Sequence, residues 1–196
     1  MTELTSERSR EIEAELHERS ETAHLIRFVE DHQTSLALLK GNKMPLRTAK
    51  VTFNTNGTFD FYGATTAYIV PIFAILPYGD PDDLVHPYGS DMIDIGAIGA
   101  FADKVATRYG IADFLGQHNF NYPPLHGKID IVKSPQRWIQ RGGFGICPIT
   151  DRAVKLLSND DRGLQLVANI HETPCLEAIL KENRPKLAEI VVGMPQ

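Results

Sequence analysis

The residues best suited to acid–base chemistry are concentrated in one irregular stretch of the chain. His118 and His126 lie eight residues apart with two prolines between them, so a turn can bring both imidazoles to one point. Histidine changes charge near neutral pH and therefore serves as a general acid or base. We predict this catalytic role for both histidines. Asn119 and Tyr122, which lie between them, are predicted to orient the substrate.

A second irregular segment, residues 77–91, precedes this stretch and is rich in proline, glycine and aspartate. Long loops of this kind display functional side chains on a rigid scaffold. We expect the loops 77–91 and 114–127 to form a pocket between them. Tyr88 lies in the first loop, and we predict that it orients the substrate together with the polar residues of the second loop.

The histidines of the two loops also predict a metal site. A catalytic divalent-metal centre needs three protein ligands and one open position. His86, His118 and His126 are the predicted ligands, with Asp91 or Asp94 as alternatives to the first of them. None of the usual close spacings of metal ligands is present, so the alternative that these histidines only hydrogen-bond the loop backbone stays open.

The chain contains two cysteines, Cys147 and Cys175. Cys147 precedes a proline, and such a pair can offer a thiolate to haem iron. Arg141 lies close to Cys147 in sequence, at the start of a glycine-rich segment, and supplies positive charge. Both residues are therefore predicted to bind a cofactor, with haem as the candidate for the thiolate. The alternative interpretation of Cys147 is a small buried hydrophobic side chain.

Residues 5–40 contain neither glycine nor proline, which favours one long helix. Apolar residues from Ala23 onward recur at helical spacing and predict packing on the domain. The preceding half is mostly charged, with Ile12 and Leu16 in an intermittent apolar stripe. An isolated helical arm is marginal in water, so we predict that it lies against a second copy in a homodimer. A frayed N-terminus is the alternative.

Residues 49–62 predict a β-hairpin. Apolar and polar residues alternate on both sides of Asn56-Gly57, a pair that supplies the positive φ angles of a two-residue type I′ turn. Residues 65–76 are β-branched, aromatic and almost wholly apolar, which favours a buried strand. Pro71 predicts a bulge or an edge position in that strand.

The remaining elements follow from caps and breakers. Ser90 or Asp91 as N-cap and a glycine at position 110 predict a central helix over 91–109. A short strand is predicted at 129–132, and short helices are predicted at 151–158, 161–171, 174–183 and 185–193. The fold class is therefore α+β, with an antiparallel sheet built on the hairpin. We divide the chain into a helical arm, 1–22, and a single domain, 23–196.

Composition excludes several classes of protein. A formal net charge of −5 and a pI near 5.8 argue against nucleic acid as a partner. No apolar run reaches the roughly 18 residues that cross a bilayer, so no membrane partner is expected. The first residues show no pattern of a secretory signal, and two cysteines cannot make a disulfide framework. We expect a cytoplasmic location.

Three functional hypotheses remain. The first is a cytoplasmic enzyme of lyase or hydrolase type that acts on a small polar molecule. Its histidine-based chemistry, metal-free or assisted by a divalent metal, takes place in the pocket between the two loops. The second is a ligand-sensing or haem-binding module that dimerises through its N-terminal helix. The third is a structural or interaction protein without chemistry.

Overall fold

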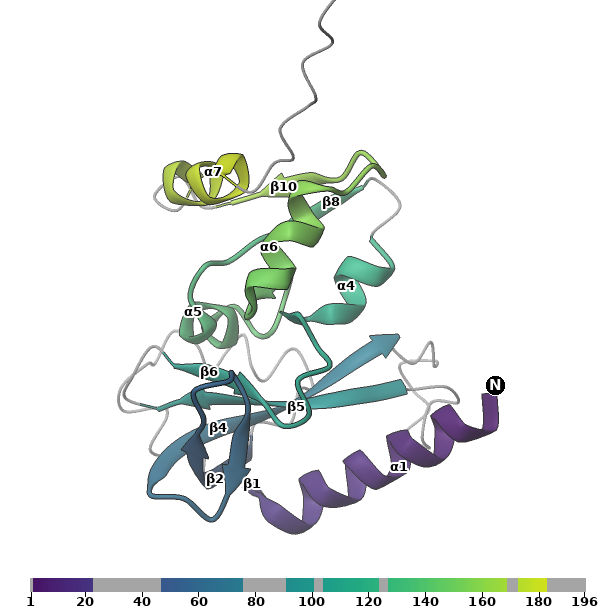
Figure 1. The fold of residues 1–196 in the computed structure, drawn as a ribbon, viewed down its shortest axis with the longest axis vertical. Coiled ribbons are helices and arrows are strands. Elements are labelled where there is room, and N and C mark those ends of the chain that lie inside the picture. The colour runs from purple at the N-terminus through teal and green to yellow at the C-terminus, as the bar shows by residue number, and fades with distance from the viewer. Residues whose placement is uncertain are drawn as a thin grey trace, which may run out of the picture.

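The computed structural model describes residues 2–22, 47–75, 91–100, 104–123, 127–168 and 173–182. These ranges have the mixed α+β fold that the sequence predicts, with a curled antiparallel sheet between α1 and a layer of short helices (Figure 1). The helices are α1 (Thr2–Arg19), α4 (Gln117–Asn121), α5 (Pro135–Gln140), α6 (Asp151–Ser158) and α7 (Thr173–Glu182). The main sheet contains β1 (Glu21–Thr22), β2 (Arg47–Phe53), β3 (Phe59–Phe61), β4 (Thr65–Ile75), β5 (Asp91–Gly99) and β6 (Val105–Thr107). Two small sheets contain β7 (Phe114–Leu115), β8 (Lys128–Asp130), β9 (Cys147–Pro148) and β10 (Gln165–Val167).

The main sheet curls until its two ends approach each other. Its strand order is β1-β2-β4-β5-β6, and β3 also pairs with β2. Thr58, at the tip of the β2–β3 hairpin, forms a bridge with Thr107 at the end of β6. The Thr107 N–H donates to the Gly57 carbonyl at 3.1 Å. The curl brings α1 and the hairpin around a shared apolar interior.

The predicted hairpin is confirmed, with Val51 opposite Phe61 and Phe53 opposite Phe59. Its turn differs from the predicted two-residue type I′ turn. Residues 54–58 form a longer loop in which Gly57 has a positive φ and Asn56 does not. The Asn56 side chain instead accepts a hydrogen bond from the backbone N–H two residues later, at 3.1 Å. Asparagine thus stabilises the turn through its side chain, which a dipeptide pattern does not distinguish from a backbone role.

The predicted buried strand is confirmed as β4, which lies between β2 and β5. Pro71 pairs with Ile95 of β5, while the described pairing with β2 reaches only as far as Ile69. The register of the β4–β5 pair shifts just after Pro71, on either side of Phe73. The proline therefore lies beside an irregular part of the strand, as its missing N–H donor predicts.

The predicted central helix over 91–109 is wrong, because the structure has strands β5 and β6 in this range. Strand β5 is hydrogen-bonded on both sides, to β4 and to β6. A central strand buried on both faces carries a nearly continuous apolar run, which imitates the apolar stripe of a helix. Gly96 has a packing reason, because a Cβ there would lie 3.0 Å from Val70 and 3.1 Å from Leu115.

Helix α1 ends at Arg19, so the predicted continuous helix over 5–40 is wrong where the chain turns into β1. Ser20 hydrogen-bonds back to the Leu16 carbonyl, and Arg47 Nε donates to Ser20 Oγ at 2.6 Å. These bonds satisfy polar groups at the end of the helix and redirect the chain. The apolar stripe predicted from Ala23 onward lies outside the described residues.

Two apolar residues of α1 are buried against the chain's own sheet. Ile12 and Leu16 are 1% and 2% exposed. They belong to a cluster with Val51, Phe59 and Ile95 of the sheet. The chain itself therefore buries the residues that we had expected a second copy to cover. The homodimer and the division of the chain at residue 22 stay predictions.

The opposite face of the sheet packs against the layer that contains α5, α6 and α4 (Figure 1). The buried cluster between them consists of Val70, Ile72, Ile98, Ala112, Leu115, Val132, Trp138, Ile139 and Cys147. The elements beyond this face, from β7 to α7, form the upper layer of the molecule. A further cluster lies within this upper layer and consists of Phe114, Phe120, Ile129, Ile131, Ile146, Ala153, Leu157 and Leu176. The upper layer therefore has a core of its own that positions α6 and α7.

The elements of the upper layer test the remaining sequence predictions. The helix at 151–158 is confirmed as α6, the helix at 174–183 as α7, and the short strand near 129 as β8. The helix predicted at 161–171 is wrong, because residues 165–167 form β10 and pair in parallel with β8. The final predicted helix, 185–193, lies outside the described residues.

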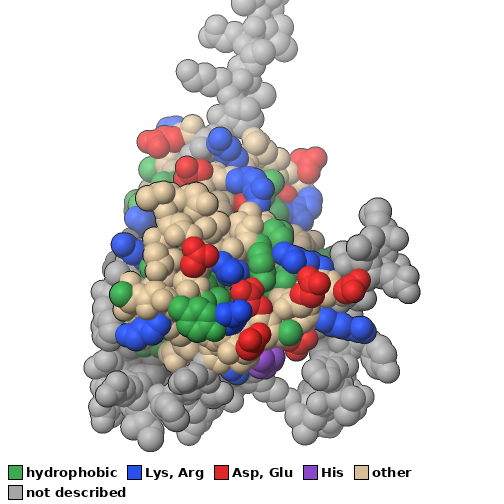
Figure 2. Space-filling model, turned by 60° about the horizontal axis from the view of Figure 1, so that its bottom comes forward, with side chains coloured by type: hydrophobic (Ala, Val, Ile, Leu, Met, Phe, Trp, Pro, Cys, Tyr) green, Lys and Arg blue, Asp and Glu red, His purple; other side chains and the backbone are tan. Residues whose placement is uncertain are grey.

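The surface around α1 mixes charges of both signs (Figure 2). Arg108 joins three elements there, because it pairs with Glu15 of α1 at 3.1 Å and with Asp60 of the hairpin at 2.6 Å. The Tyr109 hydroxyl also hydrogen-bonds to the Glu15 carboxylate. The pKa of Tyr109 is raised to about 12, mainly by burial. None of the described helices has the length and hydrophobicity that a membrane span requires.

Candidate functional site

His118 lies in the short helix α4, and its side chain is half-buried. Burial lowers its pKa from 6.5 to about 4, because the charged ring would lose hydration. The imidazole is therefore neutral at pH 7, which is the protonation state that a general base needs. The catalytic role of His118 stays a prediction.

Asn119 and Tyr122, the predicted orienting residues, lie in different environments. The Asn119 amide donates to the Gly145 carbonyl at 3.0 Å and so connects α4 to the glycine-rich segment. Tyr122 follows α4 directly and its side chain is 57% exposed. The structure thus gives Asn119 a positioning contact within the fold and leaves Tyr122 on the surface.

A chain of side-chain amides holds α4 against the sheet. Gln117 Oε1 accepts from the backbone N–H groups of Asp113 and Phe114 at 3.0 and 3.1 Å. Gln117 Nε2 donates to Asn121 Oδ1 at 3.0 Å, and Asn121 Nδ2 donates to the Ala74 carbonyl of β4 at 3.0 Å. Neither amide was predicted from the sequence, although their i,i+4 spacing is a visible signal of a helical pair.

The other predicted loop residues, His86, Tyr88 and His126, lie outside the described part of the chain. Within the described ranges, no group of three or more His, Cys, Asp or Glu side chains is arranged to hold a metal ion. Asp94, an alternative metal ligand, is 0% exposed. Both of its carboxylate oxygens accept hydrogen bonds from backbone N–H groups, so this carboxylate has a role in the fold.

Cys147 and Arg141, the predicted cofactor-binding residues, serve separate parts of the structure. Cys147 is 0% exposed in the cluster under α5, with its Sγ 3.6 Å from the Lys133 carbonyl oxygen. Arg141 pairs with Asp130 at 3.2 Å at the surface. The Cys147 thiol is thus buried, as the alternative interpretation predicts. Neither Cys147 nor Arg141 lines the cavity between α6 and α7.

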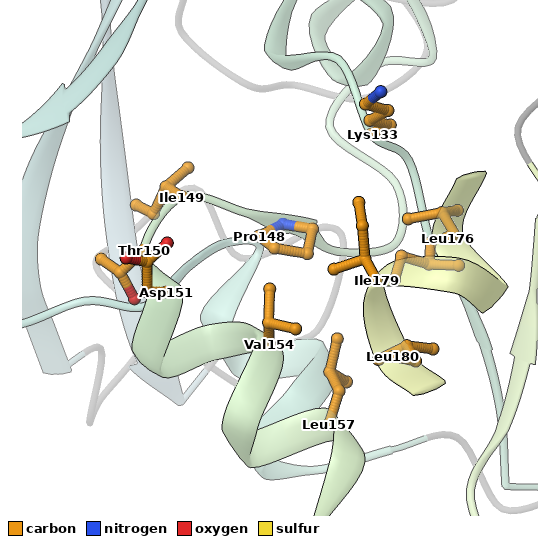
Figure 3. Close-up of a pocket in the computed structure, with 11 residues that line it drawn as sticks. Lys133, Pro148, Ile149, Thr150, Asp151, Val154, Leu157, Leu176, Ile179 and Leu180 are labelled. Atoms are coloured by element: carbon orange, nitrogen blue, oxygen red, sulfur yellow. The ribbon is translucent and has the colours of Figure 1, made fainter. Parts of the chain in front are cut away.

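A cavity of about 250 Å³ lies between α6 and α7, with β9 along one side (Figure 3). Aliphatic side chains from the two helices face each other across it, as Figure 3 shows. The lining residues are Ile131, Lys133, Pro148, Ile149, Thr150, Asp151, Val154, Leu157, Leu176, Ile179 and Leu180. The walls are therefore mostly apolar, as in small-molecule sites generally.

Polar groups border the cavity at two separate places (Figure 3). At one end, Lys133 Nζ lies 3.0 Å from the Sγ of Cys175, a half-buried residue of α7 with a free thiol. At the other end, Thr150 caps α6 by accepting from the Ala153 N–H at 3.0 Å. The Thr150 hydroxyl also donates to Asp113 at 2.6 Å, so its hydrogen-bonding capacity serves the fold. Lys133 and Cys175 form a polar pair at the first end of the cavity, and Asp151 adds a carboxylate beside Thr150 at the other end.

This cavity was not predicted from the sequence. The signal was present in α6 and α7, which carry aliphatic residues at i, i+3 and i+4 spacing. Such a stripe predicts burial, but only the tertiary arrangement shows that the two stripes leave space between them.

No protein-family model, curated protein or solved structure matches this chain.

Proposed function

We propose that this protein binds a small molecule with an apolar body and one anionic or carbonyl head group, and that the α6–α7 cavity is its binding site. The observation that carries the proposal is the apolar cavity of about 250 Å³ with a lysine at one end. A ligand pocket typically combines apolar walls with a few polar groups that fix orientation.

The volume indicates the size of the ligand. An apolar cavity of about 150 Å³ accommodates benzene, and one water-sized group occupies about 30 Å³. The α6–α7 cavity, at about 250 Å³, therefore has room for about eight groups of that size. A straight chain of about eight carbons or a single substituted ring matches this space.

The charges at the rim indicate the orientation of the ligand. Lys133 lies at one end of the cavity, and Asp151 lies at the other, next to the cap of α6 (Figure 3). A carboxylate or a polarised carbonyl is attracted to the lysine and repelled by the aspartate. The head group therefore lies next to Lys133 and the apolar body extends toward Val154 and Leu157.

Octanoate is the probe that tests this proposal, in an NMR titration that follows the Ile, Leu and Val methyl signals. Saturable shifts are expected at Ile131 and Ile179, with a Kd on the order of 0.1–1 mM for a ligand of this size. Butyrate, which is four methylenes shorter, binds at least about tenfold more weakly, because each buried methylene contributes about 0.8 kcal/mol.

Two variants on the same helix provide the matched comparison. Val154→Phe fills part of the cavity and is expected to weaken octanoate binding at least about tenfold. Lys155→Phe adds the same side chain at an exposed position of α6 that does not line the cavity, and binding is unchanged. Methyl shifts scattered over the surface, or equal binding by both variants, contradict the proposal.

The lyase or hydrolase hypothesis stays a prediction. Burial lowers the pKa of His118 to about 4, so the imidazole is neutral at pH 7 but a weak base, and this shift adds no support to a general-base role. We also infer a cytoplasmic location, because the chain's two cysteines are both free thiols, as is usual in a reducing compartment.

A further inference from the structure

Two leucines form the wall of the α6–α7 cavity on the side that faces away from Lys133. Figure 3 shows Leu157 and Leu180 close together on that side, with Val154 and Ile179 between them and the lysine. Leu157 comes from the last turn of α6, and Leu180 comes from the last turn of α7. An apolar chain that starts at Lys133 therefore meets this wall after it has passed the middle of the cavity.

The wall is closed by a hydrogen bond and by core packing. Ser158 Oγ donates to the Leu180 carbonyl oxygen at 3.1 Å, so the last turns of the two helices are held together and leave no passage for a ligand at this point. Leu157 is buried in the apolar cluster of the upper layer, and Leu180 packs against the same cluster. A ligand cannot extend past the wall without displacing close-packed side chains.

We propose that the wall made by Leu157 and Leu180 sets the maximum length of the ligand. This inference rests on the proposed function and names its ligand class, which is straight-chain carboxylates of up to about eight carbons. With the carboxylate next to Lys133, a chain of that length fills the cavity and its terminal methyl group reaches the two leucines. Additional methylenes either stay in water or move the carboxylate away from the lysine, so they add no affinity.

A smaller side chain in the wall is expected to raise the limit. Leu157→Ala removes three carbon atoms, and the surrounding core closes only partly over such a space, which leaves room for about two further methylenes. Each buried methylene raises affinity about fourfold, so decanoate is expected to bind Leu157→Ala at least about tenfold more tightly than octanoate does. For the wild-type protein, the Kd values of octanoate and decanoate are expected to differ by less than about twofold.

Leu156→Ala is the matched control, because Leu156 is the neighbouring residue of α6, is exposed and does not line the cavity. This variant is expected to keep the wild-type ratio of the two Kd values. Each titration follows the methyl signals of Ile131 and Ile179, and the urea midpoint of each variant shows whether it is folded. A folded Leu157→Ala variant that keeps the wild-type ratio overturns the proposal.

Leu180→Ala tests the same wall from α7 and decides the outcome if Leu157→Ala does not fold. Leu180 is only half-buried, so its truncation costs less stability than that of Leu157. Decanoate is expected to bind Leu180→Ala at least about fourfold more tightly than octanoate does, which corresponds to one further buried methylene. Equal affinities of this variant for the two carboxylates count against the wall as the limit.

The two proposals fail in distinguishable ways. Saturable octanoate binding to the wild-type protein, with an affinity that continues to rise about fourfold per methylene up to decanoate, removes the length limit and leaves the binding function intact. Absence of saturable binding of either carboxylate to the wild-type protein removes both.

Discussion

Replacing Asp94 by asparagine is expected to destabilise the fold severely, although the two side chains have almost the same shape. Asp94 is 0% exposed in β5. One carboxylate oxygen accepts from the N–H groups of Ile95 and Tyr109 at 2.8 and 2.9 Å. The other accepts from Ile111 and Ala112 at 2.8 and 3.1 Å. The carboxylate thus ties the chain after β6 to the centre of the sheet.

The size of the effect follows from this geometry. A carboxylate has only acceptors, whereas an amide has one acceptor oxygen and one donor NH₂ group. Asparagine therefore keeps two of the four bonds and points a donor at two backbone donors. A hydrogen bond to a charged group contributes about 1.5–3 kcal/mol, so the loss of two costs about 3–6 kcal/mol. This is a large share of the roughly 5–15 kcal/mol that stabilises a typical domain.

Urea denaturation followed by the fluorescence of Trp138, the chain's single tryptophan, measures this cost. Asp130→Asn is the matched control, because Asp130 is 41% exposed on its side chain and pairs with Arg141 at the surface. That substitution is expected to cost less than about 1 kcal/mol. The reasoning is refuted if Asp94→Asn lowers the free energy of unfolding by no more than Asp130→Asn does.

Two further predictions concern His118 and α1. Because the folded-state pKa of His118 lies near 4 and the unfolded value near 6.5, the unfolded chain binds more protons between these pH values. The contribution of His118 to the free energy of unfolding is therefore fully present above pH 6.5 and falls by about 2 kcal/mol toward pH 4, after allowance for partial exposure. His118→Gln removes this part of the pH dependence. The prediction is contradicted if the difference in urea midpoint between wild type and His118→Gln is the same at pH 7 and at pH 4.5. Ile12→Ala is expected to cost about 2–5 kcal/mol, because Ile12 is 1% exposed, whereas Glu18→Ala at an exposed position of α1 changes stability by less than about 0.5 kcal/mol. A melting temperature that rises with protein concentration indicates that a second copy adds to the stability of the fold.

Local patterns correctly predicted the elements that have one buried face and one exposed face. The hairpin 49–62 has alternating residues because one face of it is buried and the other is not, so period two was visible. Helix α6 has a Thr150 cap, and its amphipathic stripe faces the core on one side. In these segments the local propensity and the tertiary environment favour the same structure.

Segments that tertiary contacts decide were predicted wrongly. Strand β5 is apolar on both faces because it is central in the sheet, and its sequence alone did not distinguish it from a buried helix. Strand β10 is formed by pairing with β8, which is distant in sequence, so residues 165–167 had no local strand signal that outweighed helix propensity.

The candidate site divides in the same way between sequence and structure. The amino-acid sequence by itself determined which chemical groups the chain possesses: the histidine in α4, two cysteines too few for a disulfide framework, and the aliphatic stripes of α6 and α7. It also determined the α+β class, because hydrophobic periodicity is a local property. Only the tertiary structure decided that Cys147 is buried in the core, and that Cys175 meets Lys133, 42 residues away, beside a cavity. Contacts over such separations depend on how the layers pack, and no spacing along the chain encodes them.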